Sequence, residues 1–247
     1  MPAEPILAVR GLSKRYQGLR ALDGVDFEVS SGEVFGIIGP NGAGKTTLFS
    51  CLAGAVRPTA GEIRFRGERI DGLPNYAVVA RGMVRTHQIV RPFRDMTVAE
   101  NVSIGESFGA HGRRRSDPAR RVAEILEQTG LTTLASAPAG TLSIGDAKRL
   151  EIARALATEP RVLCLDEIMG GLNPAEIVAA MSLIRSVRDA GVTVLWIEHH
   201  IHAVLGVSDR ILVLNFGQKI AEGNPEAVMR QPEVVKAYLG DETEAAL

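Results

Sequence analysis

The sequence of 247 residues has little cysteine, almost no net charge and no long apolar run, and each shortage argues against a class of protein. Its two cysteines, Cys51 and Cys164, lie in apolar segments, which predicts buried reduced thiols rather than a disulfide and suits a cytosolic protein. Lysine and arginine number 28 against 29 aspartate and glutamate, so a net charge of −1 offers no broad attraction for nucleic acid. No apolar run approaches the ~18 residues of a membrane span, and Met1–Pro5 lacks the basic start of a signal peptide. We therefore expect any membrane role to act through a partner.

The most informative stretch that is present is a glycine-rich turn between an apolar run at Val34–Ile38 and a helical pattern at residues 48–53. Strand, glycine turn and helix are the context of a phosphate-binding loop, in which backbone N–H groups and a helix N-terminus face an anion. We expect Lys45 to reach the β- and γ-phosphates and the hydroxyl of Thr46 to help hold Mg²⁺. A glycine loop that binds nothing is the alternative. The candidate phosphate-binding residues are Gly39, Pro40, Asn41, Gly42, Ala43, Gly44, Lys45, Thr46 and Thr47.

The order of apolar patterns predicts an α/β fold with a P-loop NTPase (RecA-like) core. Alternating segments at 6–10, 25–29 and 62–66 predict a small antiparallel sheet beside that core. From about Thr97 to Pro160 the pattern is helical, opened by a capping box at Thr97–Glu100. Continuous apolar strands then return at 162–165, 192–197 and 211–214, with a helix between the first two at Pro174–Asp189.

Polar residues follow several of the predicted strands, at the edge where an α/β sheet presents its ligands. Asp166 and Glu167 come directly after the strand at 162–165, so Asp166 is a candidate Mg²⁺ ligand and Glu167 a candidate base for the attacking water. Two solvated carboxylates at a strand end are the alternative. Gln88 and His199 also follow predicted strands and are candidates for the γ-phosphate region, while Tyr16 could stack on an adenine.

The stretch Thr141–Leu156 resembles the signature segment of ATP-binding cassette (ABC) ATPases, and the order of motifs from Tyr16 to His199 is similar to that family over almost the whole chain. The resemblance implies that ATP and Mg²⁺ are bound between two head-to-tail ATPase domains, with Ser143 and Gly145 facing the partner's nucleotide. It also implies the role of each candidate: Tyr16 on adenine, Gln88 at the metal, the water and the transmembrane subunit, Glu167 as base, and His199 at the γ-phosphate. We expect residues 6–240 to form one domain, with a Q-loop and helical signature subdomain at 89–160 and a flexible tail at 241–247.

A narrower resemblance points to one branch of bacterial importers, the ATPase subunits for branched-chain amino acids, amides and urea. It implies transmembrane permease subunits, a second ATPase subunit that is either a copy or a related chain, and indirectly a periplasmic solute-binding protein. It also implies a peripheral place on the cytoplasmic face of the inner membrane. The segments that look like this branch are Gly72–Pro74, Arg85–Gln88, Arg149–Leu156, Gly171–Pro174, Ile197–His199 and Ala237–Gly240.

Three departures from the family pattern bear on turnover. The signature carries Ile144 and Asp146, where Gly or Tyr and Gln are usual, and the segment after Glu167 carries Ile168 for proline and Asn173 for aspartate. Asp146 favours its own helix N-terminus, yet its charge would repel the partner's triphosphate.

The sequence leaves three functions open. The first is the ATPase of an importer for branched-chain amino acids or similar small polar solutes. The second is the ATPase of a lipid or lipopolysaccharide exporter. The third is a non-catalytic ATP-binding module that regulates a complex, with Asp146 as the mark of lost activity.

Overall fold

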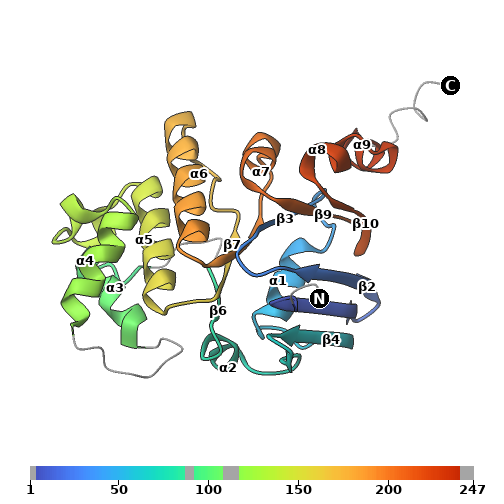
Figure 1. Ribbon diagram of the computed structural model, residues 1–247, viewed down its shortest axis with the longest axis horizontal. Coiled ribbons are helices and arrows are strands. Elements are labelled where there is room, and N and C mark those ends of the chain that lie inside the picture. Colours follow the sequence, from blue (N-terminus) through green and yellow to red (C-terminus); the bar gives the residue numbers. More distant parts are fainter. Residues whose placement is uncertain (1–3, 87–91, 108–116, 240–247) are drawn as a thin grey trace. The chain divides into compact units, whose positions relative to one another are not determined.

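The computed structural model describes residues 4–86, 92–107 and 117–239 and divides into two compact units (Figure 1). The first comprises Met1–Pro74 and Leu195–Leu247, and the second comprises Asn75–Val194. No helix in the described ranges is both long and apolar enough to cross a bilayer.

The first unit combines a four-stranded antiparallel sheet with a second set of paired strands. The antiparallel sheet has the order β2-β1-β4-β5, and β3 pairs in parallel with β9, which pairs antiparallel with β10. Its elements are β1 (Leu7–Tyr16), β2 (Leu19–Val29), β3 (Val34–Ile38), α1 (Lys45–Leu52), β4 (Ala60–Phe65), β5 (Glu68–Arg69), α7 (Ile201–Val207), β9 (Arg210–Asn215), β10 (Gln218–Gly223), α8 (Pro225–Met229) and α9 (Pro232–Leu239). Strand β8 (Thr193–Ile197) lies where the chain passes from the second unit to the first.

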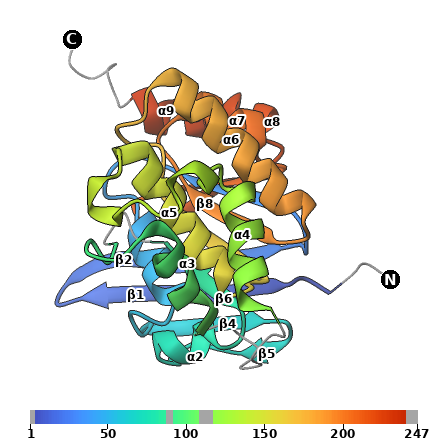
Figure 2. The ribbon, with the colours of Figure 1, turned by 90° about the vertical axis from the view of Figure 1, so that its left-hand side faces the viewer.

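The second unit contains the helical part of the chain and two parallel strands. Strand β6 pairs with β7, and in both ribbon views α3 lies beside α4 and α5 (Figure 2). Its elements are α2 (Asn75–Val79), β6 (Met83–Arg85), α3 (Val98–Ser107), α4 (Pro118–Gln128), two 3₁₀ turns (Thr132–Leu134 and Ala139–Thr141), α5 (Ile144–Ala157), β7 (Val162–Asp166) and α6 (Pro174–Asp189).

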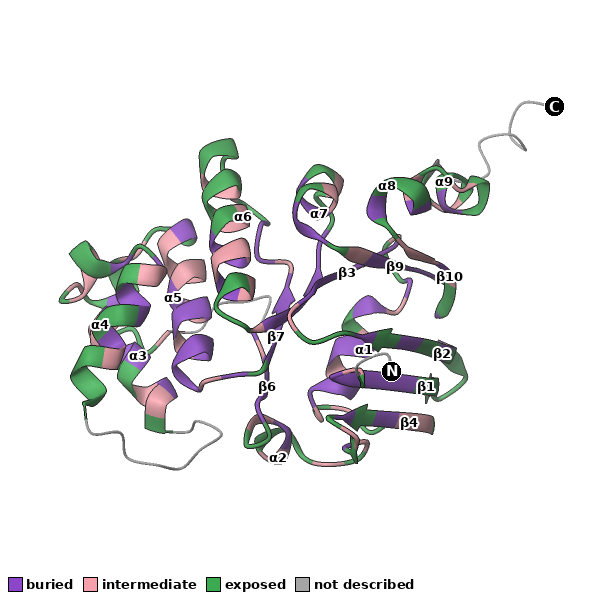
Figure 3. Cartoon of the chain, in the orientation of Figure 1, coloured by how far each residue is buried: buried purple, intermediate pink, exposed green. Residues whose placement is uncertain are grey.

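Burial explains why the central strands are continuous apolar runs. Every residue of β3 and of β7 is buried (Figure 3), as expected of strands covered on both faces. The single tryptophan, Trp196, is fully buried in β8, and its indole Nε1 donates to Ser208 Oγ at 2.9 Å. Both cysteines are free and buried as predicted, and burial raises the pKa of Cys51 to about 11 and of Cys164 to about 12. Neither thiol is therefore reactive at neutral pH.

Candidate functional site

The glycine loop leaves the end of β3 and enters α1, as its sequence context predicts. At Gly39 the backbone has φ 150°, and a Cβ there would lie 2.1 Å from the carbonyl oxygen of Leu214. No side chain fits at such a contact, so only glycine lets the loop turn away from β9 at this point. The loop then leads into the N-terminus of α1, and the backbone N–H groups in the first turn of a helix favour an anion.

Lys45, the first residue of α1, keeps its charge close to this loop. Its side chain is 5% exposed, and its ammonium donates to the carbonyl oxygens of Gly39 at 2.7 Å and Pro40 at 3.0 Å. Phosphate oxygens are charged and therefore stronger acceptors than these neutral carbonyls. The next residue, Thr46, is exposed and so accessible to a ligand. The loop thus has the donors needed to hold a polyphosphate.

Two further candidates belong to the same unit. Tyr16 ends β1 with 42% of its surface exposed, and the ammonium of Lys14 lies 4.9 Å from its ring centroid. His199 is exposed two residues after β8, and its backbone N–H donates to Glu198 Oε2 at 3.3 Å. Both residues are exposed at the surface of the first unit.

In the second unit, the two candidate carboxylates differ in burial. Asp166 is the last residue of β7 and is 2% exposed, and its Oδ2 accepts from Arg85 Nη2 at 2.5 Å. Its backbone N–H donates to Thr86 Oγ1 at 3.2 Å. Glu167, the next residue, is half-buried. The strand end therefore presents one ion-paired and one more accessible carboxylate.

Glu167 has a strained backbone. Its φ of 49° lies in the left-handed region, which glutamate rarely adopts. The ammonium of Lys148 on α5 donates to the carbonyl oxygen of Glu167 at 3.3 Å and to that of Gly170 at 2.6 Å. Lys148 therefore holds the turn that contains the strained residue. Strain maintained in this way is common at functional positions.

The signature segment forms the N-terminus of α5. Ser143 is the N-cap: its Oγ accepts from the N–H of Asp146 at 3.1 Å and donates to Asp146 Oδ2 at 2.6 Å. The other carboxylate oxygen accepts from Arg149 Nη2 at 2.5 Å. The charge of Asp146 is thus partly compensated within its own helix, and the Ser143 hydroxyl proton points to that carboxylate.

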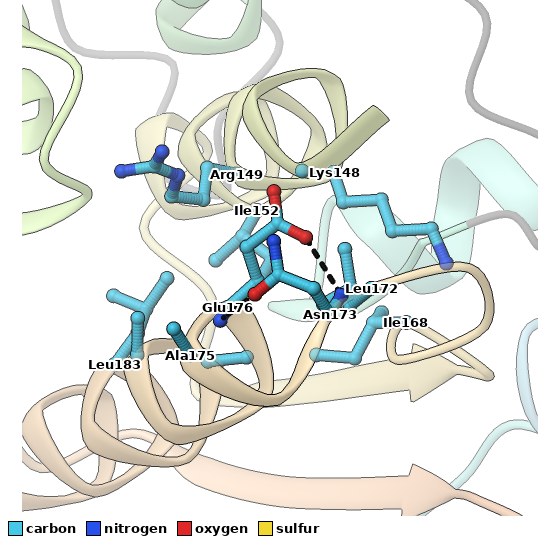
Figure 4. A pocket seen from close by; sticks show the side chains of 12 residues that line it. Lys148, Arg149, Ile152, Ile168, Leu172, Asn173, Ala175, Glu176 and Leu183 are labelled. Atoms are coloured by element: carbon cyan, nitrogen blue, oxygen red, sulfur yellow. Dashed lines mark hydrogen bonds between the residues drawn. The ribbon is translucent and has the colours of Figure 1, made fainter. Parts of the chain in front are cut away.

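Asn173 is the N-cap of α6. Its Oδ1 accepts from the N–H of Glu176 at 3.0 Å, and Glu176 Oε2 accepts from the N–H of Asn173 at 2.8 Å. These two bonds form a capping box beside a cavity of about 270 Å³ between α5 and α6 (Figure 4). Gly145 also lines this cavity, where a Cβ would lie 2.6 Å from Glu176 Oε1. A side chain at Gly145 would therefore disturb the capping box.

One candidate, Gln88, lies outside the described residues. Two residues close to the candidate carboxylates were not singled out as site residues from the sequence, Arg85 and Lys148. Arg85 stands in the Arg85–Gln88 segment that suggested the importer branch, but nothing in its local pattern indicates an acidic partner 81 positions away. Lys148 lies within the signature-like stretch Thr141–Leu156 and contacts backbone carbonyls, which carry no sequence signal.

Known proteins of one family match this chain. A family model described as ABC transporter matches residues 22–170, and one described as branched-chain amino acid ATP-binding cassette transporter matches residues 218–244. The high-affinity branched-chain amino acid transport ATP-binding protein BraF of Pseudomonas aeruginosa is 44% identical over 97% of this chain and 99% of its own length. The corresponding protein LivG of Escherichia coli (strain K12) is 42% identical over the same shares.

Solved structures agree with this match. The ADP conformation of MJ1267, an ATP-binding cassette of an ABC transporter, has a TM-score of 0.86 at 33% identity and covers 97% of this chain and 100% of its own. A dimeric structure of the cassette MJ0796 bound to ADP and Pi has a TM-score of 0.79 at 25% identity, covering 89% and 98%. The chain therefore belongs to the ABC transporter family, as an ATP-binding subunit that couples ATP hydrolysis to transport.

Proposed function

We propose that this subunit energises the import of branched-chain amino acids. The observation that carries the proposal is the identity of 44% to BraF, a branched-chain amino acid transport protein, over nearly the full length of both chains. The match of residues 218–244 to a family model of the same transport class supports it independently, because that segment lies outside the general cassette match at 22–170. This second match favours the importer over the lipid exporter.

The chemistry that we assign to the chain is hydrolysis of ATP at a site shared by two cassettes. In this assignment Gly39–Thr47 hold the phosphates, Tyr16 stacks on adenine, Glu167 activates the water, and Gln88 and His199 act at the γ-phosphate. Ser143 and Gly145 contact the nucleotide that is bound to the other cassette. The dimeric cassette bound to ADP and Pi supports a two-cassette arrangement. We take residues 6–240 as one domain that carries all these roles, with a subdomain at 89–160.

We assign Mg²⁺ to Thr46, Asp166 and Gln88. Mg²⁺ prefers oxygen ligands and is usually held by one or two carboxylates together with substrate phosphates and water. Hydroxyl, carboxylate and amide oxygens make up the proposed set. The buried carboxylate of Asp166 supplies negative charge for such a site, and in this structure Arg85 is paired with it. When bound, the metal would neutralise charge that develops on the transferred phosphoryl group.

The proposed partners are transmembrane permease subunits, a second ATPase subunit and, through the permease, a periplasmic solute-binding protein. Their assembly would place the chain at the cytoplasmic face of the inner membrane, where ATP is supplied. The names of the relatives support this arrangement, because each is an ATP-binding protein for transport.

The test is reconstitution. The chain is co-purified with its permease subunits, placed in liposomes with ATP and the solute-binding protein, and assayed for uptake of radiolabelled leucine. Lys45→Ala removes the phosphate-facing charge and should lower uptake on the order of 100-fold, as loss of one such electrostatic contact does elsewhere. Lys219→Ala, a change of the same type in β10, is the control and should leave uptake unchanged. Leucine uptake that survives Lys45→Ala would contradict the proposal, and ATP-driven movement of lipid instead of leucine would favour the exporter.

A further inference from the structure

The ion pair between Arg85 and Asp166 is fixed by the pairing of two strands. In the parallel register of β6 and β7, Arg85 lies opposite Cys164, two residues before Asp166. The N–H of Thr86 donates to the carbonyl oxygen of Cys164 at 2.9 Å, and the N–H of Asp166 donates to Thr86 Oγ1 at 3.2 Å. The two charged side chains therefore meet because the backbone holds their strand ends side by side.

Both members of this pair are shielded from water. The Arg85 side chain is 11% exposed and that of Asp166 is 2% exposed, and 2.5 Å separates Nη2 from Oδ2. The pair Arg69–Asp71 is more open, since its arginine side chain is 60% exposed. A buried carboxylate needs a compensating charge, and a paired arginine supplies one.

The same carboxylate is the one that we assign to Mg²⁺. A divalent cation close to Asp166 would share its carboxylate with the guanidinium, and the two cations would repel each other in surroundings of low polarity. Arg85 therefore stabilises the charged carboxylate of Asp166, and it also opposes the binding of a metal ion beside that carboxylate.

We propose that Arg85 is a positioning residue of the metal site: it holds the Asp166 carboxylate through their ion pair and sets how strongly Mg²⁺ enhances nucleotide binding. The inference rests on the proposed assignment of Asp166 to the metal. It concerns binding rather than the transported solute, so it does not depend on which solute is carried.

The experiment measures the affinity of the full-length chain for a fluorescent, non-hydrolysable ATP analogue, once in EDTA and once in excess free Mg²⁺. The ratio of the two dissociation constants is the metal enhancement, and no ATPase activity enters it. Arg85→Met should raise this ratio about five- to tenfold, in the range typical of couplings between two ligands. Arg85→Lys keeps the positive charge and should stay close to the natural chain. Arg69→Met, the same change in the exposed pair with Asp71, should leave the ratio unaltered.

An unchanged or lower ratio in Arg85→Met would overturn the inference, because a purely structural loss shifts both dissociation constants together. If that variant fails to fold, Arg85→Gln supplies a neutral side chain that can still donate to the carboxylate, and the same rise is expected. Asp166→Asn separates the two hypotheses. It should bring the ratio towards one; if it does not, the metal assignment fails and the inference with it. If Asp166→Asn brings the ratio towards one but Arg85→Met leaves the ratio unchanged, the metal assignment stands and only the inference about Arg85 is overturned.

Discussion

At the scale of single residues, Asp146 is the departure with the clearest expected effect on ATP turnover. Its carboxylate accepts from Ser143 Oγ and from Arg149, so the serine hydroxyl is committed within its own helix. In the proposed composite site that hydroxyl faces the γ-phosphate of the nucleotide bound to the partner. The negative charge of Asp146 would repel this phosphate. The natural side chain is therefore expected to restrain ATP binding at the site that it faces.

We predict that Asp146→Asn lowers the KM for ATP of the assembled complex by about three- to tenfold, since a like-charge contact of about 1 kcal/mol is removed. Steady-state ATPase assays over a range of ATP concentrations measure this. Asp189→Asn makes the same change at an exposed position near the end of α6 and should have no effect. A higher KM in Asp146→Asn would mean that the carboxylate assists the site, and the repulsion argument would be wrong.

The Arg85–Asp166 pair shows what residue patterns do not reveal. Asp166 was singled out from the sequence because it follows a predicted apolar strand, and the structure places it at the end of β7. Its partner was not singled out, since the contact depends on the parallel register of β6 and β7, which pairs Arg85 with Cys164. The compensation of Asp146 by Arg149 is different, because residues three apart on a helix are neighbours. That contact could have been expected once α5 was placed.

At the scale of elements, the Asn173 cap shows that a departure from the family pattern can preserve local structure. Asparagine caps a helix about as well as aspartate, and here it closes a reciprocal pair of bonds with Glu176 at the start of α6. The replacement therefore removes a negative charge from this segment without loosening the helix that follows.

We predict that Asn173→Ala lowers the unfolding free energy by about 1 kcal/mol, as loss of a helix N-cap typically does. Asn173→Asp restores an oxygen acceptor and should stay within a few tenths of a kcal/mol of the natural chain. Urea denaturation followed by circular dichroism measures both. Asn224 is the N-cap of α8, where its Oδ1 accepts from the N–H groups of Glu226 and Ala227. Asn224→Ala therefore removes a cap of the same type and is the comparison. If Asn173→Ala left the unfolding free energy unchanged while Asn224→Ala lowered it, the capping box would contribute nothing to stability.

Elements with a strong pattern were predictable, and elements stabilised by distant pairing were not. Strand β3 and the first four residues of β7 are apolar runs, and both strands are confirmed. Helix α6 is confirmed because Pro174 and Gly191 mark its ends. Strand β1 extends to Tyr16, well beyond the predicted 6–10, since pairing with β2 and β4 stabilises polar residues that show no alternation. In the turn from β1 to β2 the backbone of Gln17 has φ 48°, a conformation that a glutamine in the sequence does not predict.

At the scale of the whole molecule, one chain carries both halves of the proposed chemistry, and in the proposed two-cassette arrangement it uses each half on a different nucleotide. The phosphate loop begins at Gly39, and Ser143 of the signature segment lies about a hundred residues later. In the two-cassette arrangement the signature of one subunit completes the site of the other. The isolated chain should therefore bind ATP through Gly39–Thr47 and hydrolyse it slowly, and its association should depend on which nucleotide is bound.

We predict that Glu167→Gln converts the chain from a monomer into an ATP-dependent dimer. Removing the candidate base should lower hydrolysis by roughly 100- to 10,000-fold, the usual contribution of general base catalysis, so the ATP-bound state persists. Light scattering after size exclusion should give twice the mass of 26.4 kDa with ATP and Mg²⁺, and the single mass with ADP. Glu233→Gln, an exposed glutamate of α9 changed in the same way, should remain monomeric under both conditions. If Glu167→Gln stays monomeric with ATP, even when mixed with the related ATPase subunit of its transporter, Glu167 is not the base that limits the lifetime of the closed pair.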